Sequence, residues 1–404
     1  MDNNYNIINL ILNNALFGKN LPIPKDVDWQ AVYQEMSDQS LTGLIGPVLG
    51  SIPDMDPELK SQWKREVIAQ VHRYYRYLDI QEEVLSVLRS HQIPCVVLKG
   101  CAAGMYYPNP EYRAMGDIDL LVHPKDFNRS VEILLENGYK EYEHTPDRDR
   151  EFIVQKQGCT IELHKTFLGI DESKIYHSEI FDKCIYDGIE RSEVYRADIY
   201  KIPVLPKLSN GLVLLKHVYQ HLYNNLGMRQ IVDWMMYVNE HLDDAYWSEV
   251  FQKEIRAYGL ETLAVTVTRM CQLYLGLSET NRTWCMKADE KVCHNLMQHI
   301  VKNGNMGRKL VKVDEIGSIF IYKKGIGSMV RNLQSDGVKG WKILEKAPFL
   351  KPFAWIYQIC HYVHRWFYHG AKVGQLFEYE GEAKRVRHLY EQLELPKYEN
   401  NKMR

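Results

Sequence analysis

Two aspartates open a short apolar run in the segment Asp117-Ile118-Asp119-Leu120-Leu121. On a β-strand, side chains two residues apart point to the same face, so Asp117 and Asp119 project together, away from the apolar face. Carboxylates held this close repel each other unless a cation lies between them, and oxygen ligands of this kind suit Mg²⁺. The segment therefore predicts a strand edge that carries a metal site, and this is our leading hypothesis.

Two other parts of the chain carry residues suited to the same site. The apolar run Val96–Leu98 ends in Lys99-Gly100, where a glycine lets the backbone approach a phosphate closely. In the predicted strand Cys159–His164, Glu162 and His164 share a face. Glu162 is thus a candidate third carboxylate, and a solvated strand face is the alternative. His164 either supports a metal ligand or is a hydrogen-bonded strand residue.

These residues resemble a bacterial family of uncharacterised nucleotidyltransferases within the polymerase β-like superfamily. The motifs that carry the resemblance are Leu98-Lys99-Gly100, Tyr107-Pro108, Arg113, Asp117–Leu121 and Glu162-Leu163-His164. The superfamily usually has Gly-Ser after its first strand, whereas this chain has Gly100-Cys101, so the usual hydroxyl is missing where the phosphates are held. The resemblance implies an α+β fold, with a polymerase β-like mixed sheet and flanking helices.

The activity implied by the resemblance is transfer of a nucleoside monophosphate from a nucleoside triphosphate (NTP) to an acceptor. Asp117 and Asp119 would hold two Mg²⁺ ions, and Glu162 would complete one ion's ligand shell and help to deprotonate the acceptor. Lys99, Gly100 and Arg113 are candidates for phosphate contacts. Because the two aspartates repel each other without metal, we expect Asn at either position to leave stability unchanged or to raise it.

A further pair of candidates follows in the C-terminal half. Arg229 and Asp233 lie four residues apart in a predicted helix, where the family also shows an Arg and an Asp. They form either a helix salt bridge, or a site in which Arg229 holds the triphosphate and Asp233 supports it or contacts substrate. His217 and His221 are also one turn apart, and we expect a packed or capping pair rather than metal ligands.

The pattern of apolar residues divides the chain into three regions. Residues 1–92 are predicted to be helical, with helices around Ile7–Leu16, over Trp29–Gln39 and over Pro57–Ser90. Residues 93–207 are predicted to form the nucleotidyltransferase core, in which Ile185–Leu205 is expected to form strands. Residues 208–404 are predicted to be a helical domain.

Composition limits the class of partner. The net charge is −2 and there is no basic block, which disfavours nucleic acid and favours a small-molecule or peptide acceptor. The eight cysteines show no zinc spacing and no basic-apolar leader precedes them, which favours a cytoplasmic protein with reduced thiols. Pro352–Gly370 predicts a packed amphipathic helix, with a membrane-surface helix as the alternative.

The sequence leaves two other functions open. One is a non-catalytic nucleotide-binding or regulatory protein on the same fold. The other is phosphoryl transfer, which uses similar metal ions. The acceptor, the preferred NTP and the oligomeric state are not determined by the sequence.

Overall fold

A computed structural model of the chain describes residues 3–52, 54–142, 151–166, 178–222, 225–309, 330, 333–334, 337–338, 340–368 and 375–395. The chain forms two compact units, Met1–Arg308 and Lys309–Arg404. The first unit contains all of the candidate site residues. Our division of the chain at residues 92 and 207 into three regions stays a prediction.

The centre of the first unit is a mixed seven-stranded sheet with the strand order β3-β4-β5-β2-β1-β7-β6. β1 pairs antiparallel with β2, while β2 pairs parallel with β5. The predicted strands around residues 96–98, 117–122 and 159–164 therefore lie side by side in one sheet. The strands are β1 Cys95–Leu98, β2 Ile118–Val122, β3 Lys140–Glu141, β4 Glu151–Lys156, β5 Cys159–His164, β6 Glu193–Ala197 and β7 Tyr200–Val204.

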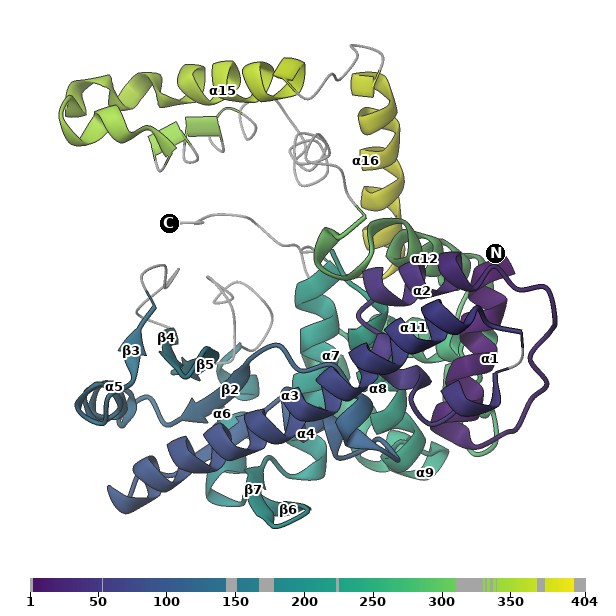
Figure 1. Ribbon diagram of the computed structural model, residues 1–404. Helices are drawn as coiled ribbons and strands as arrows, with labels where there is room; N and C mark the ends of the chain where they lie inside the picture. The colour runs from purple at the N-terminus through teal and green to yellow at the C-terminus, as the bar shows by residue number, and fades with distance from the viewer. Residues whose placement is uncertain are drawn as a thin grey trace. The chain divides into compact units, whose positions relative to one another are not determined.

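Helices precede, flank and follow the sheet, so the first unit is an α+β fold (Figure 1). The three helices predicted before the sheet are confirmed as α1, α2 and α3. The helices are α1 Asn3–Phe17, α2 Trp29–Asp38, α3 Pro57–Ser90, α4 Gly100–Gly104, α5 Phe127–Glu136, α6 Ser178–Glu190, α7 Lys207–Leu222, α8 Met228–His241, α9 Asp244–Tyr246, α10 Gln252–Ala257, α11 Glu261–Tyr274 and α12 Glu290–Asn303.

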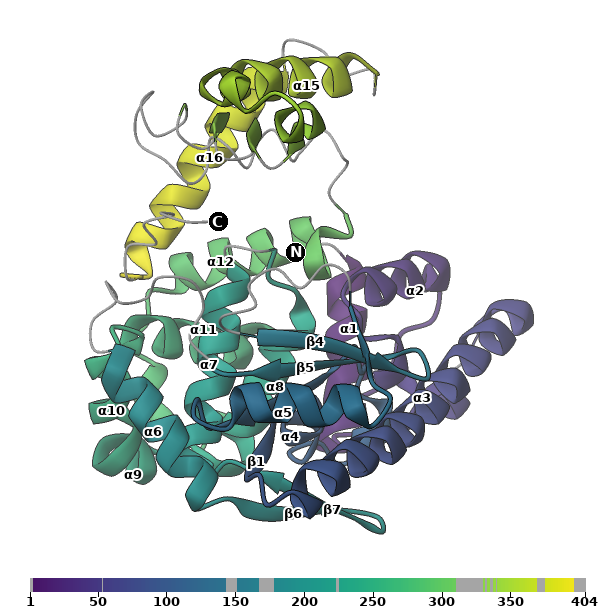
Figure 2. The same ribbon diagram turned by 90° about the vertical axis from the view of Figure 1, so that its left-hand side faces the viewer.

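One face of the sheet packs against α3 and α5, which Figure 2 shows beside the strands. Val97, Leu120 and Leu163 belong to the hydrophobic core formed with these helices. Val97 is paired with Leu120, and Leu120 with Leu163, so the three side chains stand in a row on the same face. Their strand neighbours Asp119 and Glu162 consequently point to the opposite face.

The structure corrects one predicted element. Ile185–Leu205 was expected to form strands, but its first part belongs to α6, and β6 and β7 follow as an antiparallel hairpin. The segment was ambiguous because α6 is short and its apolar residues also suit a buried strand. β4 and β5 form a second antiparallel hairpin, with Gln157 and Gly158 at φ of +49° and +75° in its two-residue turn.

The second unit is helical where it is described. Its elements are the 3₁₀ helices η8 Lys342–Glu345 and η9 Pro348–Phe353 and the α-helices α15 Ala354–Tyr368 and α16 Gln375–Gln392. The amphipathic helix predicted over Pro352–Gly370 is thus found as α15. Among the described residues, no helix combines the length and apolar character that crossing a bilayer requires.

Candidate active site

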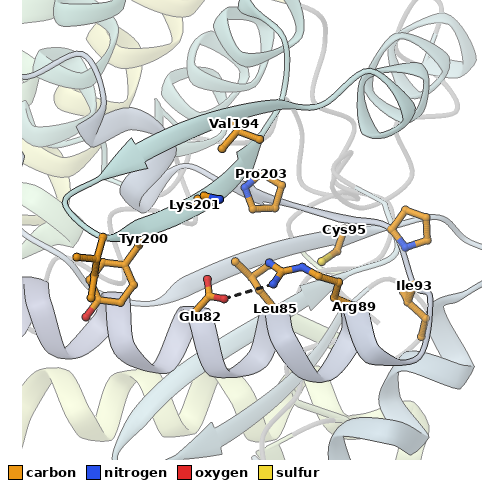
Figure 3. A pocket seen from close by; sticks show the side chains of 11 residues that line it. Glu82, Leu85, Arg89, Ile93, Cys95, Val194, Tyr200, Lys201 and Pro203 are labelled. Atoms are coloured by element: carbon orange, nitrogen blue, oxygen red, sulfur yellow. Dashed lines mark hydrogen bonds and ion pairs between the residues drawn. The ribbon is translucent and has the colours of Figure 1, made fainter.

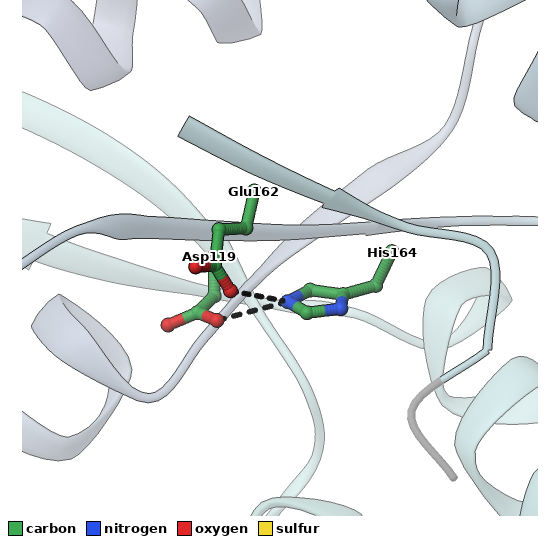
Figure 4. Close-up of side chains that lie close together, drawn as sticks. All are labelled: Asp119, Glu162 and His164. Atoms are coloured by element: carbon green, nitrogen blue, oxygen red, sulfur yellow. Dashed lines mark hydrogen bonds and ion pairs between the residues drawn. The ribbon is translucent and has the colours of Figure 1, made fainter. Parts of the chain in front are cut away.

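The candidate site is built on the sheet face opposite α3 and α5. Asp119 of β2 is the direct partner of Glu162 in the parallel strand β5, so the sheet register alone brings the two carboxylates together. His164 lies two residues further along β5, on the same face as Glu162. The three side chains each offer one ligand atom, and these atoms lie within 4.8 Å of one another (Figure 4). They could hold a metal ion.

Asp119 is the centre of the hydrogen bonding in this cluster. Its Oδ1 atom accepts from Lys99 Nζ at 2.8 Å and from His164 Nε2 at 2.9 Å. A carboxylate only accepts, so the second bond requires the hydrogen to be on Nε2 of His164. Lys99 comes directly after β1 at a φ of +46°, and Gly100 follows at +30°. This rare backbone conformation of Lys99 turns the chain at the strand end.

The carboxylates of the site differ in acidity because their surroundings differ. Burial works against ionisation of Asp119, but Lys99 and His164 outweigh it and hold the pKa of Asp119 well below its usual value. For Glu162, burial followed by repulsion from Asp119 and Asp117 raises the pKa to about 7. In return, although burial disfavours its charged form, the carboxylates raise the pKa of Lys99, so it stays a cation.

Asp117 is the remaining carboxylate that the sequence predicts for the site. It lies directly before β2 and is half-buried. Repulsion from Asp119, followed by burial, raises the pKa of Asp117. Asp117 is therefore close enough to act electrostatically on both Asp119 and Glu162, although the compact ligand group contains His164 in its place. Its role as a metal ligand stays a prediction.

Arg113 and Asp233 form a buried ion pair that joins the loop before β2 to α8. Arg113 donates from Nε and Nη2 to the two carboxylate oxygens of Asp233 at 2.6 and 2.7 Å. Tyr107 adds a hydrogen bond of 2.7 Å from its hydroxyl to Asp233. Burial, followed by the Asp233 charge, raises the pKa of Tyr107 well above its usual value, so the phenol stays protonated and donates. This geometry favours a structural role for Arg113 over the expected phosphate contact.

Arg229 does not make the contact with Asp233 that its position one helical turn away would allow, and Arg113 makes the two-point contact with that carboxylate. The helix salt bridge that was one interpretation of the Arg229 and Asp233 spacing is not found among the described residues. The Nε atom of Arg229 is buried and has no hydrogen-bond partner among the residues that the structure describes. Burial and the neighbouring Arg113 lower the pKa of Arg229. A Cβ added at Gly116 would lie 3.7 Å from Arg229 Nη1, which places this guanidinium beside the residue that precedes Asp117.

Two side chains of α3 hold the loop before Asp117, and no pattern in the sequence indicates either role. Gln70 donates to the backbone carbonyl of Arg113 at 2.7 Å, and Tyr77 donates to that of Gly116 at 2.8 Å. Both side chains are buried. Helix α3 thus supplies hydrogen bonds to two backbone carbonyls of this loop, those of Arg113 and Gly116.

The two histidines of α7 agree with the expected packed pair. The rings of His217 and His221 meet edge to face with centroids 4.5 Å apart. Burial and then His221, together with the cations Lys99 and Arg229, lower the pKa of His217 well below its usual value. His217 is therefore neutral, and it lies near the cations Lys99 and Arg229.

A cavity of about 550 Å³ lies at the other end of β1 (Figure 3). Cys95, the first residue of β1, lines this cavity, whereas Lys99 follows the last one. The remaining walls come from the C-terminal half of α3 and from the hairpin of β6 and β7, with Glu82 and Arg89 forming an exposed ion pair of 3.4 Å. None of the carboxylates of the candidate site lines it, so the cavity is separate from the chemistry described above.

Asn substitutions should separate the two aspartates by the sign of their effect on stability. The ion pair of Lys99 with Asp119 revises the expectation from the aspartate pair alone, because Asp119→Asn removes the charge that compensates the partly buried Lys99. We therefore expect the free energy of unfolding of this variant to fall by about 3 kcal/mol in metal-free buffer. Asp117→Asn relieves repulsion and should leave that free energy unchanged or raise it. Chemical denaturation with a chelator present measures both. A loss of equal size in the two variants would contradict this electrostatic account.

The raised pKa of Glu162 predicts a pH dependence of stability. Between its ordinary value of 4.5 and the folded value of about 7, the unfolded chain ionises this group while the folded chain keeps its proton. Rising pH therefore lowers the stability of the wild type across this window. Glu162→Gln lacks this loss. The free energy of unfolding of the variant minus that of the wild type should therefore be larger at about pH 8 than at about pH 5, measured by denaturation in metal-free buffer. The same difference at both pH values would refute it.

Comparison with known proteins shows the family to which the chain belongs. The model of a family described as uncharacterised nucleotidyltransferase matches residues 25–276, which is more than half of the chain. The match includes the whole sheet, the carboxylate cluster and the ion pair of Arg113 with Asp233. A search of curated proteins finds no match. The chain belongs to the family of uncharacterised nucleotidyltransferases.

Proposed function

We propose that this chain transfers a nucleoside monophosphate from an NTP to an acceptor in a reaction that depends on divalent metal ions. The observation that carries the proposal is the group of Asp119, Glu162 and His164, whose ligand atoms lie within 4.8 Å of one another on one sheet face. Family membership supports the reaction class. The polymerase β-like form of the fold and Mg²⁺ as the metal are parts of the same proposal.

The donor set fits a divalent metal. Carboxylate oxygens suit Mg²⁺ and Mn²⁺, and one imidazole extends the choice to metals such as Zn²⁺. For His164 to offer Nε2, its hydrogen must move to Nδ1, which lies 3.6 Å from a carboxylate oxygen of Glu151. That carboxylate would hold the required tautomer in place. When bound, the metal would neutralise charge on the triphosphate.

The residues of the chain divide the remaining tasks between them. Asp117, Asp119 and Glu162 hold the metal ions, and Glu162, whose side chain is partly exposed, also faces the acceptor and accepts its proton. Arg229 and Lys99 bind the phosphates, since both are cations beside the carboxylates. Gly100 gives the backbone room at the same point. Asp233 acts by positioning Arg113, and His164 joins the metal ligands once its hydrogen has moved to Nδ1. The near-zero net charge supports a small-molecule or peptide acceptor.

A non-catalytic nucleotide-binding protein is the second candidate. The observation that favours it is the ion pair of Lys99 with Asp119, because this pair neutralises the most buried carboxylate without any metal. Such a protein would bind an NTP through Lys99 and Arg229 but would leave it intact.

A labelling experiment separates these functions. Purified protein is incubated with Mg²⁺, a cell extract and each NTP labelled at the α-phosphate, and the labelled pool is identified. We expect transfer of label, reduced by about 10²–10⁴-fold in Glu162→Gln with little change in nucleotide affinity. Transfer from the γ-phosphate alone would indicate phosphoryl transfer. Nucleotide binding without any transfer would support the second candidate, and equal turnover in Glu162→Gln would remove this residue from the mechanism.

The two arginines should behave differently when each is replaced by glutamine. Arg229→Gln removes a cation without a strong internal partner, so NTP affinity should fall by about tenfold or more while stability is retained. Arg113→Gln leaves Asp233 buried and unpaired, which should cost about 3–5 kcal/mol of unfolding free energy. Calorimetric titration with NTP and Mg²⁺, together with denaturation of each variant, measures both effects. Retained NTP affinity in Arg229→Gln would exclude it from phosphate binding.

A further inference from the structure

The second unit exposes several large apolar side chains that the proposed reaction does not use. They come from η8, η9 and the first turn of α15. Their exposed fractions are 54% for Ile343, 77% for Phe349, 53% for Phe353 and 42% for Ile356. Lys346 and Lys351 are exposed between them. We call these six residues the aromatic-basic patch.

The patch belongs to elements whose other side is packed. On α15, Ala354 and Gln358 are buried one turn apart, whereas Ile356 and Cys360 are exposed one turn apart. The start of the helix is tied to an earlier segment, because the backbone N–H of Trp355 donates to Gln334 at 3.1 Å. The exposed apolar side chains are thus held on an ordered surface, and large apolar groups held in this way indicate a binding surface.

The charge around the patch selects the kind of partner. The chain as a whole has a net charge of −2, but the charged side chains that the structure describes between Ile343 and Ile356 are Lys346 and Lys351, both basic and exposed. A basic segment with aromatic residues on an amphipathic helix is typical of binding at the surface of anionic membranes. A second copy of the chain fits less well, because a two-fold interface built on this patch would bring two basic surfaces together.

We propose that the aromatic-basic patch docks the protein on the surface of an anionic lipid bilayer. Phe349 and Phe353 enter the boundary between headgroups and acyl chains, and the two lysines contact lipid phosphates. The membrane is bound at its surface and is not crossed. This proposal is independent of the reaction at the carboxylate cluster.

Sedimentation of the full chain with vesicles tests the proposal. The probes are vesicles of phosphatidylcholine alone and of phosphatidylcholine mixed with phosphatidylglycerol. We expect binding to the mixed vesicles that weakens with added salt, and much weaker binding to phosphatidylcholine. Phe349→Ser with Phe353→Ser should weaken binding by about tenfold or more. Lys346→Gln and Lys351→Gln should each weaken it by about fivefold.

A matched control uses other exposed apolar residues of the same chain. Val194 and Ile199, in the hairpin of β6 and β7, are 60% and 79% exposed, so Val194→Ser with Ile199→Ser removes comparable surface elsewhere. This variant should bind as the wild type does. The proposal is overturned if the wild type ignores mixed vesicles, if both lipid compositions bind equally, or if the serine pair in the patch has no more effect than the control pair. Dimerisation lost with the patch, without vesicle binding, would assign the patch to self-association. If the serine pair fails to fold, the lysine variants decide.

Discussion

The carboxylate of Asp119 is the constraint on which the site depends. It is almost fully buried on strand β2, and an ionised group that is buried must have partners. Lys99 supplies one from the end of the neighbouring strand and His164 supplies another from the strand on the other side. Three adjacent strands are therefore tied together at a charge, and the arrangement of Lys99, Asp119 and His164 follows from the sheet register.

A second buried charge connects this sheet to the helices that follow it. Asp233 takes both of its strong hydrogen bonds from Arg113, 120 residues earlier in the chain, and a third from Tyr107. A bidentate pair of this kind fixes orientation as well as distance. Since Arg113 lies four residues before Asp117, the start of α8 and the edge of the carboxylate cluster are positioned together. The pair thus makes the helices after residue 207 part of the site's architecture.

Sequence reasoning predicted the elements whose patterns are local. The stripe of α3, the apolar strands and the alternation that places Glu162 with His164 each depend on neighbours a few residues away, and all three are confirmed. The sequence predicts a phosphate contact for Lys99, but it does not predict the hydrogen bond from Lys99 to Asp119. No spacing in the sequence shows which carboxylate a lysine reaches after a turn at positive φ. Similarly, Tyr107 was recognised as a motif residue, but its partner lies 126 residues away.

The arginines show why such pairings escape sequence analysis. Arg229 and Asp233 have the spacing of a helix salt bridge, which contributes little energy at a surface. Arg113 offers Asp233 a two-point contact from another element, which engages both carboxylate oxygens and fixes their orientation. Asp233 cannot serve both guanidinium groups equally. Arg229 therefore keeps an Nε atom without a hydrogen bond among the described residues, and its guanidinium lies beside the residue that precedes Asp117. This arrangement comes from tertiary geometry, and it makes Arg229 a candidate for binding an anionic substrate.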